Sequence, residues 1–355
     1  MNIENENIEK IKGAIFKVRQ WININKKIIL IVSLIFIILM ITSAIILLNI
    51  EPQQKYVIYD GNNLKESKYP GYKEKIDEIL ETHPNWEITL LYTRLDWNEV
   101  ISNEGHKDGV KNPSNLIPDS SKYPEEFRCK KCEGKVYDNG TWLCASDEAI
   151  RHQMDPRNFL NEEEIFQFKE LSYNEKAQKR EIIKEITKET FLEGEETLDA
   201  ICEAGKKANL DLYYIASRLI QEQGRKGTIL SKGNEYKDKI VYNVFNVNAK
   251  GNSTKEIIEN ASKYAYERNW YSLDKSLIEG IEFMKNGYIG KGQNTLYFQK
   301  FDVIYNKEDK GLYKNQYMQN LFAPISEAKN MYETYLNSNT VNEGANFIIP
   351  LYENM

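Results

Sequence analysis

A single glutamate, Glu222, stands where a helix with an apolar face is about to end. Residues 211–224, "DLYYIASRLIQEQG", repeat apolar side chains at helical spacing. Glu222 follows Leu219 by three positions, so it lies in line with the apolar stripe, just before Gly224, which should end the helix. A carboxyl in such poorly hydrated surroundings has a raised pKa and can donate a proton, as a glycosidase acid does. The alternative is a surface ion pair with Arg218, four residues earlier.

Cysteines form the second group of residues that could do chemistry. Cys129 and Cys132 have the Cys-x₂-Cys spacing of a zinc knuckle, and Cys144 with His152 would complete four ligands. In an oxidising compartment two of these thiols would instead form a disulfide. Because a second Cys-x₂-Cys pair is missing, zinc, a disulfide and free thiols all stay open. Cys202 stands apart among apolar residues and is expected in the core.

Other chemistries find little support in the sequence. It has no serine–histidine–aspartate arrangement and no phosphate-binding loop, and we predict no cofactor. The net charge of −6 comes from 47 basic and 53 acidic residues that are well interspersed, which argues against nucleic acid as a partner.

The elements that must position Glu222 are mostly helices. Apolar residues at helical spacing predict helices over 197–208, 211–223 and 273–285, a fourth that starts at Ser253, and a fifth that starts after Pro324. Ser253 with glutamate three residues later has the spacing of a capping box. Clear strand alternation is scarce, so a mainly α fold is predicted.

Four ordered blocks resemble one known family. They are "SRLIQEQG" (217–224), "YNVFNVNA" (242–249), "GKGQNTLYFQKFDV" (290–303) and "NQYMQNLFAP" (315–324). In this order they resemble the bacterial endo-β-N-acetylglucosaminidases of glycoside hydrolase family 73, which cut peptidoglycan glycan strands and have a lysozyme-like fold. The resemblance covers about residues 190–340. The preceding segments "MDPRNFL" and "IFQFKELSY" resemble the region before this domain in membrane-anchored members.

The resemblance implies roles for four residues. Glu222 matches the family's general acid, and Tyr317 matches a cleft tyrosine implicated in catalysis. Phe245 and Tyr297 match aromatic positions expected to bind sugar rings, although core packing is the alternative for each of these aromatic residues. No metal ligand is assigned to this site. Asn246 departs from the pattern, because family members commonly have glycine at this position, and this puts the local groove shape in doubt.

The second catalytic group stays open. Glu235 and Asp238 lie in an irregular region that could fold over the cleft. One of them could be the partner carboxylate, at the separation from Glu222 that a retaining or an inverting enzyme requires. The alternative is that both are ordinary loop charges. The remaining alternative is attack by the substrate's own N-acetyl group, which needs no second carboxylate.

A long apolar run precedes these regions. Residues 28–50 contain no charge and are long enough to cross a membrane, which favours a transmembrane helix over a cleaved signal peptide. Cations before the run predict that residues 1–27 are cytoplasmic and that the rest faces outward from the cell membrane, toward the wall.

These features together predict a membrane-anchored cell-wall hydrolase. It combines the transmembrane helix, an extracellular N-terminal α-rich extension over 51–189, a lysozyme-like glucosaminidase domain over 190–340 and a C-terminal tail over 341–355. The predicted reaction cleaves the β-1,4 bond after N-acetylglucosamine in peptidoglycan glycan strands. The alternatives are a muramidase, a lytic transglycosylase and a non-catalytic wall-binding scaffold. The sequence assigns no role to residues 70–190.

Overall fold

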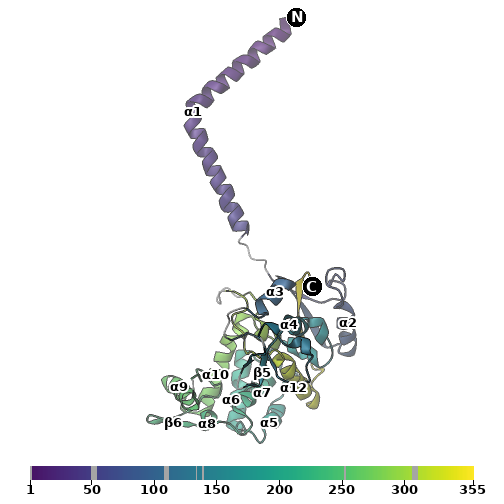
Figure 1. The fold of residues 1–355 in the computed structure, drawn as a ribbon, viewed down its shortest axis with the longest axis vertical. Coiled ribbons are helices and arrows are strands. Elements are labelled where there is room, and N and C mark those ends of the chain that lie inside the picture. The colour runs from purple at the N-terminus through teal and green to yellow at the C-terminus, as the bar shows by residue number, and fades with distance from the viewer. Residues whose placement is uncertain are drawn as a thin grey trace. The chain divides into compact units, whose positions relative to one another are not determined.

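The helices predicted around Glu222 are present in the computed structural model of the chain, which describes residues 2–48, 54–107, 112–132, 134–137, 140–251, 253–305 and 311–355 (Figure 1). The predicted five are α6 (Glu195–Ala208), α7 (Leu212–Gln223), α9 (Thr254–Glu267), α10 (Leu273–Gly287) and α12 (Ala323–Asn337). Ser253 caps α9, because its hydroxyl accepts a hydrogen bond from the backbone N–H of Glu256.

Shorter helices surround these five. They are α2 (Lys73–Thr82), α3 (Trp97–Glu104), α4 (Asp147–Met154), α5 (Arg180–Thr187), α8 (Ile229–Lys232) and α11 (Leu296–Phe301). Single 3₁₀ turns are η1 (Glu125–Phe127), η2 (Lys130–Cys132), η4 (Pro156–Phe159), η5 (Glu164–Phe168) and η6 (Ile289–Lys291).

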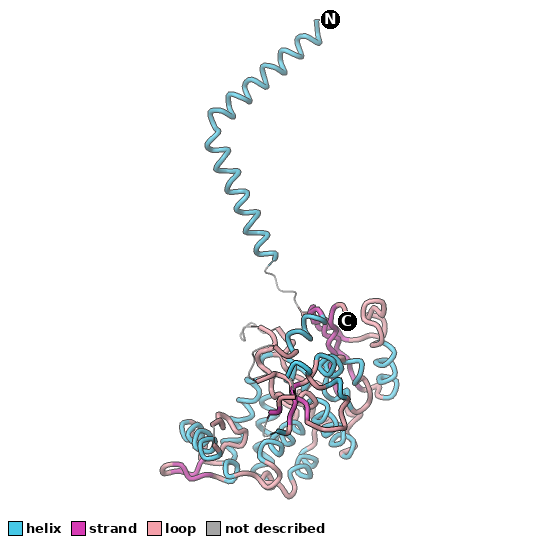
Figure 2. Tube along the Cα trace, in the orientation of Figure 1, coloured by secondary structure: helices cyan, strands magenta, loops and turns pink. Residues whose placement is uncertain are grey.

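The fold also contains three small sheets, so the predicted mainly α class, with an α-rich extension, is wrong and the fold is mixed (Figure 2). The first sheet has the order β1 (Lys55–Ile58), β2 (Trp86–Asp96), β8 (Ala345–Glu353), with β1 antiparallel and β8 parallel to β2. The second has the order β3 (Leu116–Pro118), β5 (Trp142–Cys144), β4 (Val136–Tyr137). The third is the hairpin β6 (Asn234–Tyr236) and β7 (Lys239–Val241).

The strands of the first sheet could not be predicted from the sequence, for a physical reason. The central part of β2 and most of β8 are buried on both faces, so their apolar residues run continuously instead of alternating. Trp86 of β2 pairs with Ala345 of β8, a partner that local sequence cannot identify. Residues 345–353, within the predicted tail, are thus part of the first sheet.

The predicted membrane anchor is corrected by the structure. Residues 2–48 form one helix, α1 (Asn2–Leu48), and its first half carries several lysines. Among the residues that the structure describes, no helix combines the length and apolar character that a membrane span requires. This finding overturns the predicted transmembrane helix over 28–50, of which residues 49 and 50 lie outside the described part. It also overturns the single-pass, outward-facing membrane location that was inferred from that helix.

The chain divides into two units, Met1–Gln53 and Gln54–Met355. The second unit contains the sheets, α2 to α12 and an extensive hydrophobic core. The finer boundaries at 189/190 and 340/341 stay predictions.

A buried ion pair fixes the start of α7. Asp211 accepts hydrogen bonds from the backbone N–H groups of Tyr213 and Tyr214, which caps the helix. Its second carboxylate oxygen lies 2.7 Å from Nζ of Lys169 and accepts a hydrogen bond of 2.6 Å from the Tyr335 hydroxyl. The helix that carries Glu222 in its last turn is therefore anchored to the core at its first turn.

Candidate active site

Glu222 lies in the last turn of α7, where the predicted helix end is confirmed. Gly224 follows the helix with a φ of +68°, a backbone conformation that favours glycine. The Glu222 side chain is half-buried, and two side chains from distant parts of the sequence donate hydrogen bonds to its carboxylate. The end of α7 is thus a point where three segments meet.

Tyr317 is the first of these donors. Its hydroxyl lies 2.9 Å from Oε1 of Glu222, so the structure brings together the two residues to which the family resemblance assigns catalytic roles. The backbone N–H of Tyr317 donates to the carbonyl of Gln299 in α11. Burial, together with the charges of Glu222 and Glu327, raises the pKa of the Tyr317 phenol well above its ordinary value, although Arg218 opposes this. Tyr317 therefore remains a protonated donor at neutral pH.

Arg218 supports Tyr317 and does not pair with Glu222. Its guanidinium carbon lies 3.9 Å from the centroid of the Tyr317 ring, which is cation–π geometry. Its terminal nitrogen lies 3.1 Å from the Glu327 carboxylate in α12, and the Arg218 side chain is only 4% exposed. Burial raises the pKa of Glu327, with Arg218 opposing the shift. The surface pair with Glu222, considered from the sequence, is replaced by this buried pair.

Asn246 is the second donor to Glu222. Its Nδ2 lies 3.2 Å from Oε2 of the carboxylate and 3.0 Å from the backbone oxygen of the same residue. Gln223 donates to Oδ1 of Asn246 at 2.8 Å, which fixes the orientation of the amide. Asn246 has a φ of +52°, and asparagine tolerates this left-handed conformation better than other residues with a side chain. Asn246 thus adopts a backbone conformation that glycine also favours, and its side chain adds a contact to the carboxylate.

We expect the Asn246→Gly variant to lose activity while keeping its stability. Glycine suits the positive φ, but it removes the amide that orients Glu222, so kcat should fall by about 3- to 10-fold with little change in KM. Asn248→Gly is the matched control, because Asn248 has a φ of +58° and is exposed. Equal losses of kcat in both variants would show that backbone conformation, and not the contact to Glu222, is responsible.

The two aromatic residues predicted to bind sugar lie in different surroundings. Phe245 is half-buried beside Asn246, with its ring packed so closely on α10 that a Cβ on Gly280 would lie 2.2 Å from it. Tyr297 has no exposed surface, and its hydroxyl donates to the carbonyl of Met154 at 2.7 Å. The structure therefore places Tyr297 in the core instead of on a groove wall, because its ring has no accessible face.

The two acidic residues considered as partner carboxylates lie on the β6–β7 hairpin. Both Glu235 and Asp238 are exposed, and Asp238 accepts a hydrogen bond of 3.1 Å from the Tyr266 hydroxyl. The contacts to the Glu222 carboxylate described above come from Tyr317 and Asn246, and not from either of these acidic residues. The two side chains that donate hydrogen bonds to the Glu222 carboxylate are a phenol and an amide, and neither is a second carboxylate.

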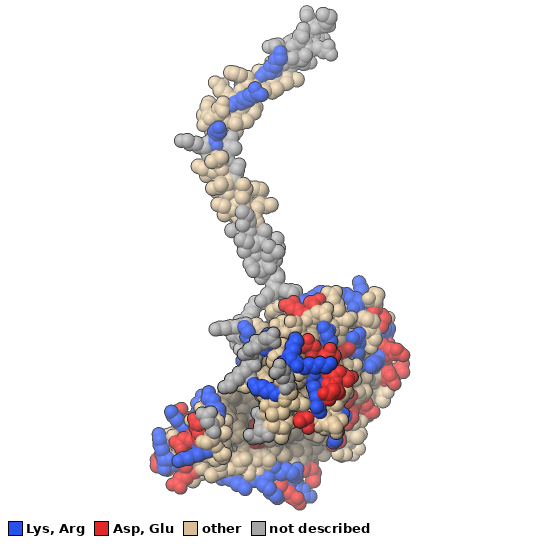
Figure 3. Space-filling view, in the orientation of Figure 1, with Lys and Arg blue, Asp and Glu red and all other residues tan. Residues whose placement is uncertain are grey.

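A cavity adjoins this network at Arg218. This cavity of about 600 Å³ between α5, α7 and α12 is lined by Arg218, Gln221 and Glu327, but its lining does not include Glu222. The space-filling view shows a second, mostly uncharged recess between the lobe with α9 and the rest of the unit (Figure 3). Because neither Tyr317 nor Glu222 lines the first cavity, this cavity is not assigned to the candidate site.

Sequence reasoning missed Arg218 and Asn246 as parts of the site. Arg218 precedes Glu222 by one helical turn, a spacing that first suggests a surface pair. Asn246 attracted notice only as a departure from glycine. Asparagine at a position where the resemblance implies glycine is itself a signal of positive φ, and it could have pointed to a polar contact.

Comparisons with known proteins show what parts of the chain are similar to. No family model matches the chain. It is 25% identical over 228 residues to a β-N-acetylglucosaminidase of Bacillus subtilis, covering 63% of this chain and 24% of that protein. It is 28% identical over 170 residues to a bifunctional autolysin of Staphylococcus epidermidis, covering 45% of this chain and 12% of the relative. The chain therefore spans about a quarter or less of the length of these curated relatives.

Solved structures extend the similarity to the fold. The crystal structure of S. aureus glucosaminidase B matches with a TM-score of 0.56 and 22% identity, covering 76% of this chain and 94% of that one. A crystal structure of the major bifunctional autolysin matches with a TM-score of 0.51 and 23% identity, over 75% of this chain and 98% of the other. The chain is thus similar in sequence to a glucosaminidase and an autolysin, and its mixed, lysozyme-like fold is that of glucosaminidase B.

Proposed function

We propose that this protein is a glycoside hydrolase that cleaves the β-1,4 bond after N-acetylglucosamine in peptidoglycan glycan strands. The observation that carries the proposal is the half-buried Glu222 carboxyl at the end of α7, oriented by Tyr317 and Asn246. The names of its relatives, β-N-acetylglucosaminidase and bifunctional autolysin, support the same substrate class.

In the proposed reaction Glu222 acts as the general acid. It donates a proton to the glycosidic oxygen as the bond to the anomeric carbon breaks. Its neighbours at hydrogen-bond distance are the Tyr317 phenol and the Asn246 amide, which have protons to donate but are not carboxylate nucleophiles. This favours attack on the anomeric carbon by the acetamido oxygen of the substrate, with the phenol orienting that group. Water then opens the cyclic intermediate, so the product keeps the β configuration.

The reducing ends of the products test the proposal. Purified peptidoglycan digested with the protein should, after borohydride reduction, give fragments that end in reduced N-acetylglucosamine by mass spectrometry. Reduced N-acetylmuramic acid would identify a muramidase, and anhydro ends would identify a lytic transglycosylase. Binding to wall without release of any reducing ends would identify a non-catalytic scaffold.

A further inference from the structure

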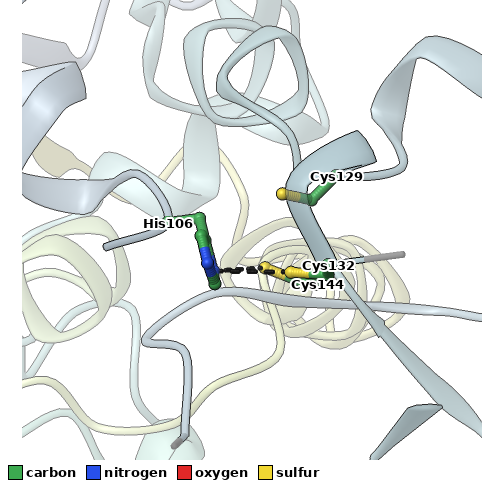
Figure 4. Close-up of side chains that lie close together, drawn as sticks. All are labelled: His106, Cys129, Cys132 and Cys144. Carbon is green, nitrogen blue, oxygen red and sulfur yellow. Dashed lines mark hydrogen bonds between the residues drawn. The ribbon is translucent and has the colours of Figure 1, made fainter. Parts of the chain in front are cut away.

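Four side chains with metal-binding atoms converge far from Glu222 in the sequence. They are His106, Cys129, Cys132 and Cys144, and their ligand atoms all lie within 4.8 Å of one another. Figure 4 shows the His106 ring directed at the sulfur atoms of Cys132 and Cys144, with Cys129 above them. The three cysteines that the sequence offered as zinc ligands thus form one compact cluster with a histidine.

The histidine of the cluster differs from the predicted one. His152 lies elsewhere: its Nδ1 is 3.1 Å from the Gln153 amide and its ring packs against Phe127. The sequence offered His152 as a fourth ligand and showed no partner pattern for His106, which reaches the cluster from the chain just after α3. Pairing of β5 with β3 brings the chain after α3 back to Cys144.

We infer that His106, Cys129, Cys132 and Cys144 form a structural zinc site. The Nδ1 atom of His106 lies 3.4 Å from Sγ of Cys132 and 3.5 Å from Sγ of Cys144. With Zn–S at about 2.3 Å and Zn–N at about 2.0 Å, a tetrahedral site has an N···S edge of about 3.5 Å. Three cysteines and one histidine are also a common ligand set of structural zinc sites, in which protein side chains fill all four coordination positions of the metal.

The backbone around the cysteines has the form of a knuckle. Cys129 donates its N–H to the carbonyl of Cys144, so the Cys-x₂-Cys turn is joined directly to β5. Lys135 donates to the carbonyl of Cys132, and Gly134 between them has a φ of +72°. The turn therefore presents two sulfur atoms toward β5, where the third lies.

Redox alternatives fit this arrangement less well. All four cysteines of the chain are free thiols. A disulfide within the cluster would bring two sulfur atoms to about 2.05 Å and leave an odd thiol beside the imidazole. The hollow beside the cysteines is lined by two lysines, Lys130 and Lys135, and by Arg128, whose charge is paired with Asp119 and Glu125. The positive charge of the two lysines favours the net negative charge of three thiolates bound to one Zn²⁺.

The cluster is linked to the loop that carries Tyr317. Two residues before His106, the buried Glu104 accepts hydrogen bonds of 2.7 and 2.8 Å from the amide of Gln316. Leu116 of β3 donates its N–H to the carbonyl of Gln319 and accepts from Leu321. Zinc would therefore hold two elements in place: the small sheet, to which Gln319 and Leu321 after Tyr317 are bonded, and the end of α3, to which Gln316 before Tyr317 is bonded. This coupling to catalysis rests on the proposed function, whereas the metal site does not.

Metal content is the first test. The full chain, purified without chelator and without added metal, should contain about one zinc per chain by inductively coupled plasma mass spectrometry. The Cys132→Ser and His106→Gln variants should lose at least about nine-tenths of this zinc, whereas Cys202→Ser and His152→Gln should keep it. Zinc retained in both ligand variants, or a cluster disulfide found by mass spectrometry in the wild-type chain, would overturn the inference.

A second measurement does not depend on the folding of variants. Cobalt exchanged into the wild-type chain should give the intense visible absorption of tetrahedral cobalt with thiolate ligands, and its absence would overturn the inference. Removing the metal should lower Tm by roughly 5 °C or more and reduce glycan cleavage, both restored by zinc. Cleavage that persists in the metal-free chain would refute the link to Tyr317. Failure of the zinc measurements leaves the reducing-end test of the proposed function unaffected.

Discussion

The Glu222→Gln variant should cleave glycan strands at least about 10³-fold more slowly than the wild-type chain, because glutamine has no proton to donate to the leaving oxygen. The side chain lies in the last turn of a helix and is only half-buried, so an amide of nearly the same shape should leave the fold intact. Its oxygen can still accept from Tyr317. The NH₂ group of the new glutamine would face the NH₂ group of Asn246. Because both are donors, the hydrogen bond from Asn246 to the side chain at position 222 is lost.

Release of reducing ends from purified peptidoglycan measures this effect, with Tm as the test of folding. Glu235→Gln and Asp238→Asn are matched controls, because both residues are exposed on the β6–β7 hairpin, and each should keep activity within about twofold. Tyr317→Phe should give an intermediate loss of about tenfold, since it removes one hydrogen bond to the acid but not the acid. Substantial activity in Glu222→Gln, or a comparable loss in a hairpin variant, would move the acid role to another residue.

The Asp211→Asn variant should lose about 3 kcal/mol or more of stability. Asparagine can still cap α7, but it leaves the ammonium group of Lys169 buried without a counter-charge. The Lys169 side chain is 4% exposed and that of Asp211 is fully buried, so water cannot replace the lost partner. The Tyr335 hydroxyl also loses its charged acceptor.

Urea unfolding followed by circular dichroism measures this loss. Asp199→Asn is the control, because its ion pair with Arg180 lies on the surface, with both side chains more than 40% exposed, and should contribute less than about 1 kcal/mol. The double variant Lys169→Met with Asp211→Asn should recover much of the loss, since no unpaired charge remains. A loss in Asp211→Asn no larger than in Asp199→Asn would show that the pair does not hold the start of α7.

Several features could be predicted from the sequence because they depend on neighbours within a few positions. The periodic apolar residues, the capping serine at 253 and the glycine at 224 determine where helices begin and end, and the structure confirms those helices. The position of Glu222 at the end of α7 follows from the same local pattern. The four ordered blocks also pointed to glucosaminidases, with which the comparisons agree.

The tertiary structure decided which residues face one another. Tyr297 occurs in a motif with Gln-Asn-Thr-Leu, yet packing against Phe168 and Phe301 buries it fully, because burial depends on elements distant in the sequence. Tyr317, Asn246 and Glu222 come together only when the loops before α12 and after β7 fold onto α7.

The metal ligands and the sheets show the same limit of local sequence. His106 and not His152 joins the cysteines, because the β3–β5 pairing determines which histidine reaches them. The first sheet requires β8 to pair with a strand some 250 positions earlier, and no short-range pattern encodes that register. The local pattern of residues thus determined the helices and the position of Glu222 at the end of α7. Long-range backbone pairing and burial decided which side chains donate hydrogen bonds to Glu222, which histidine joins the cysteines, and that the fold is mixed.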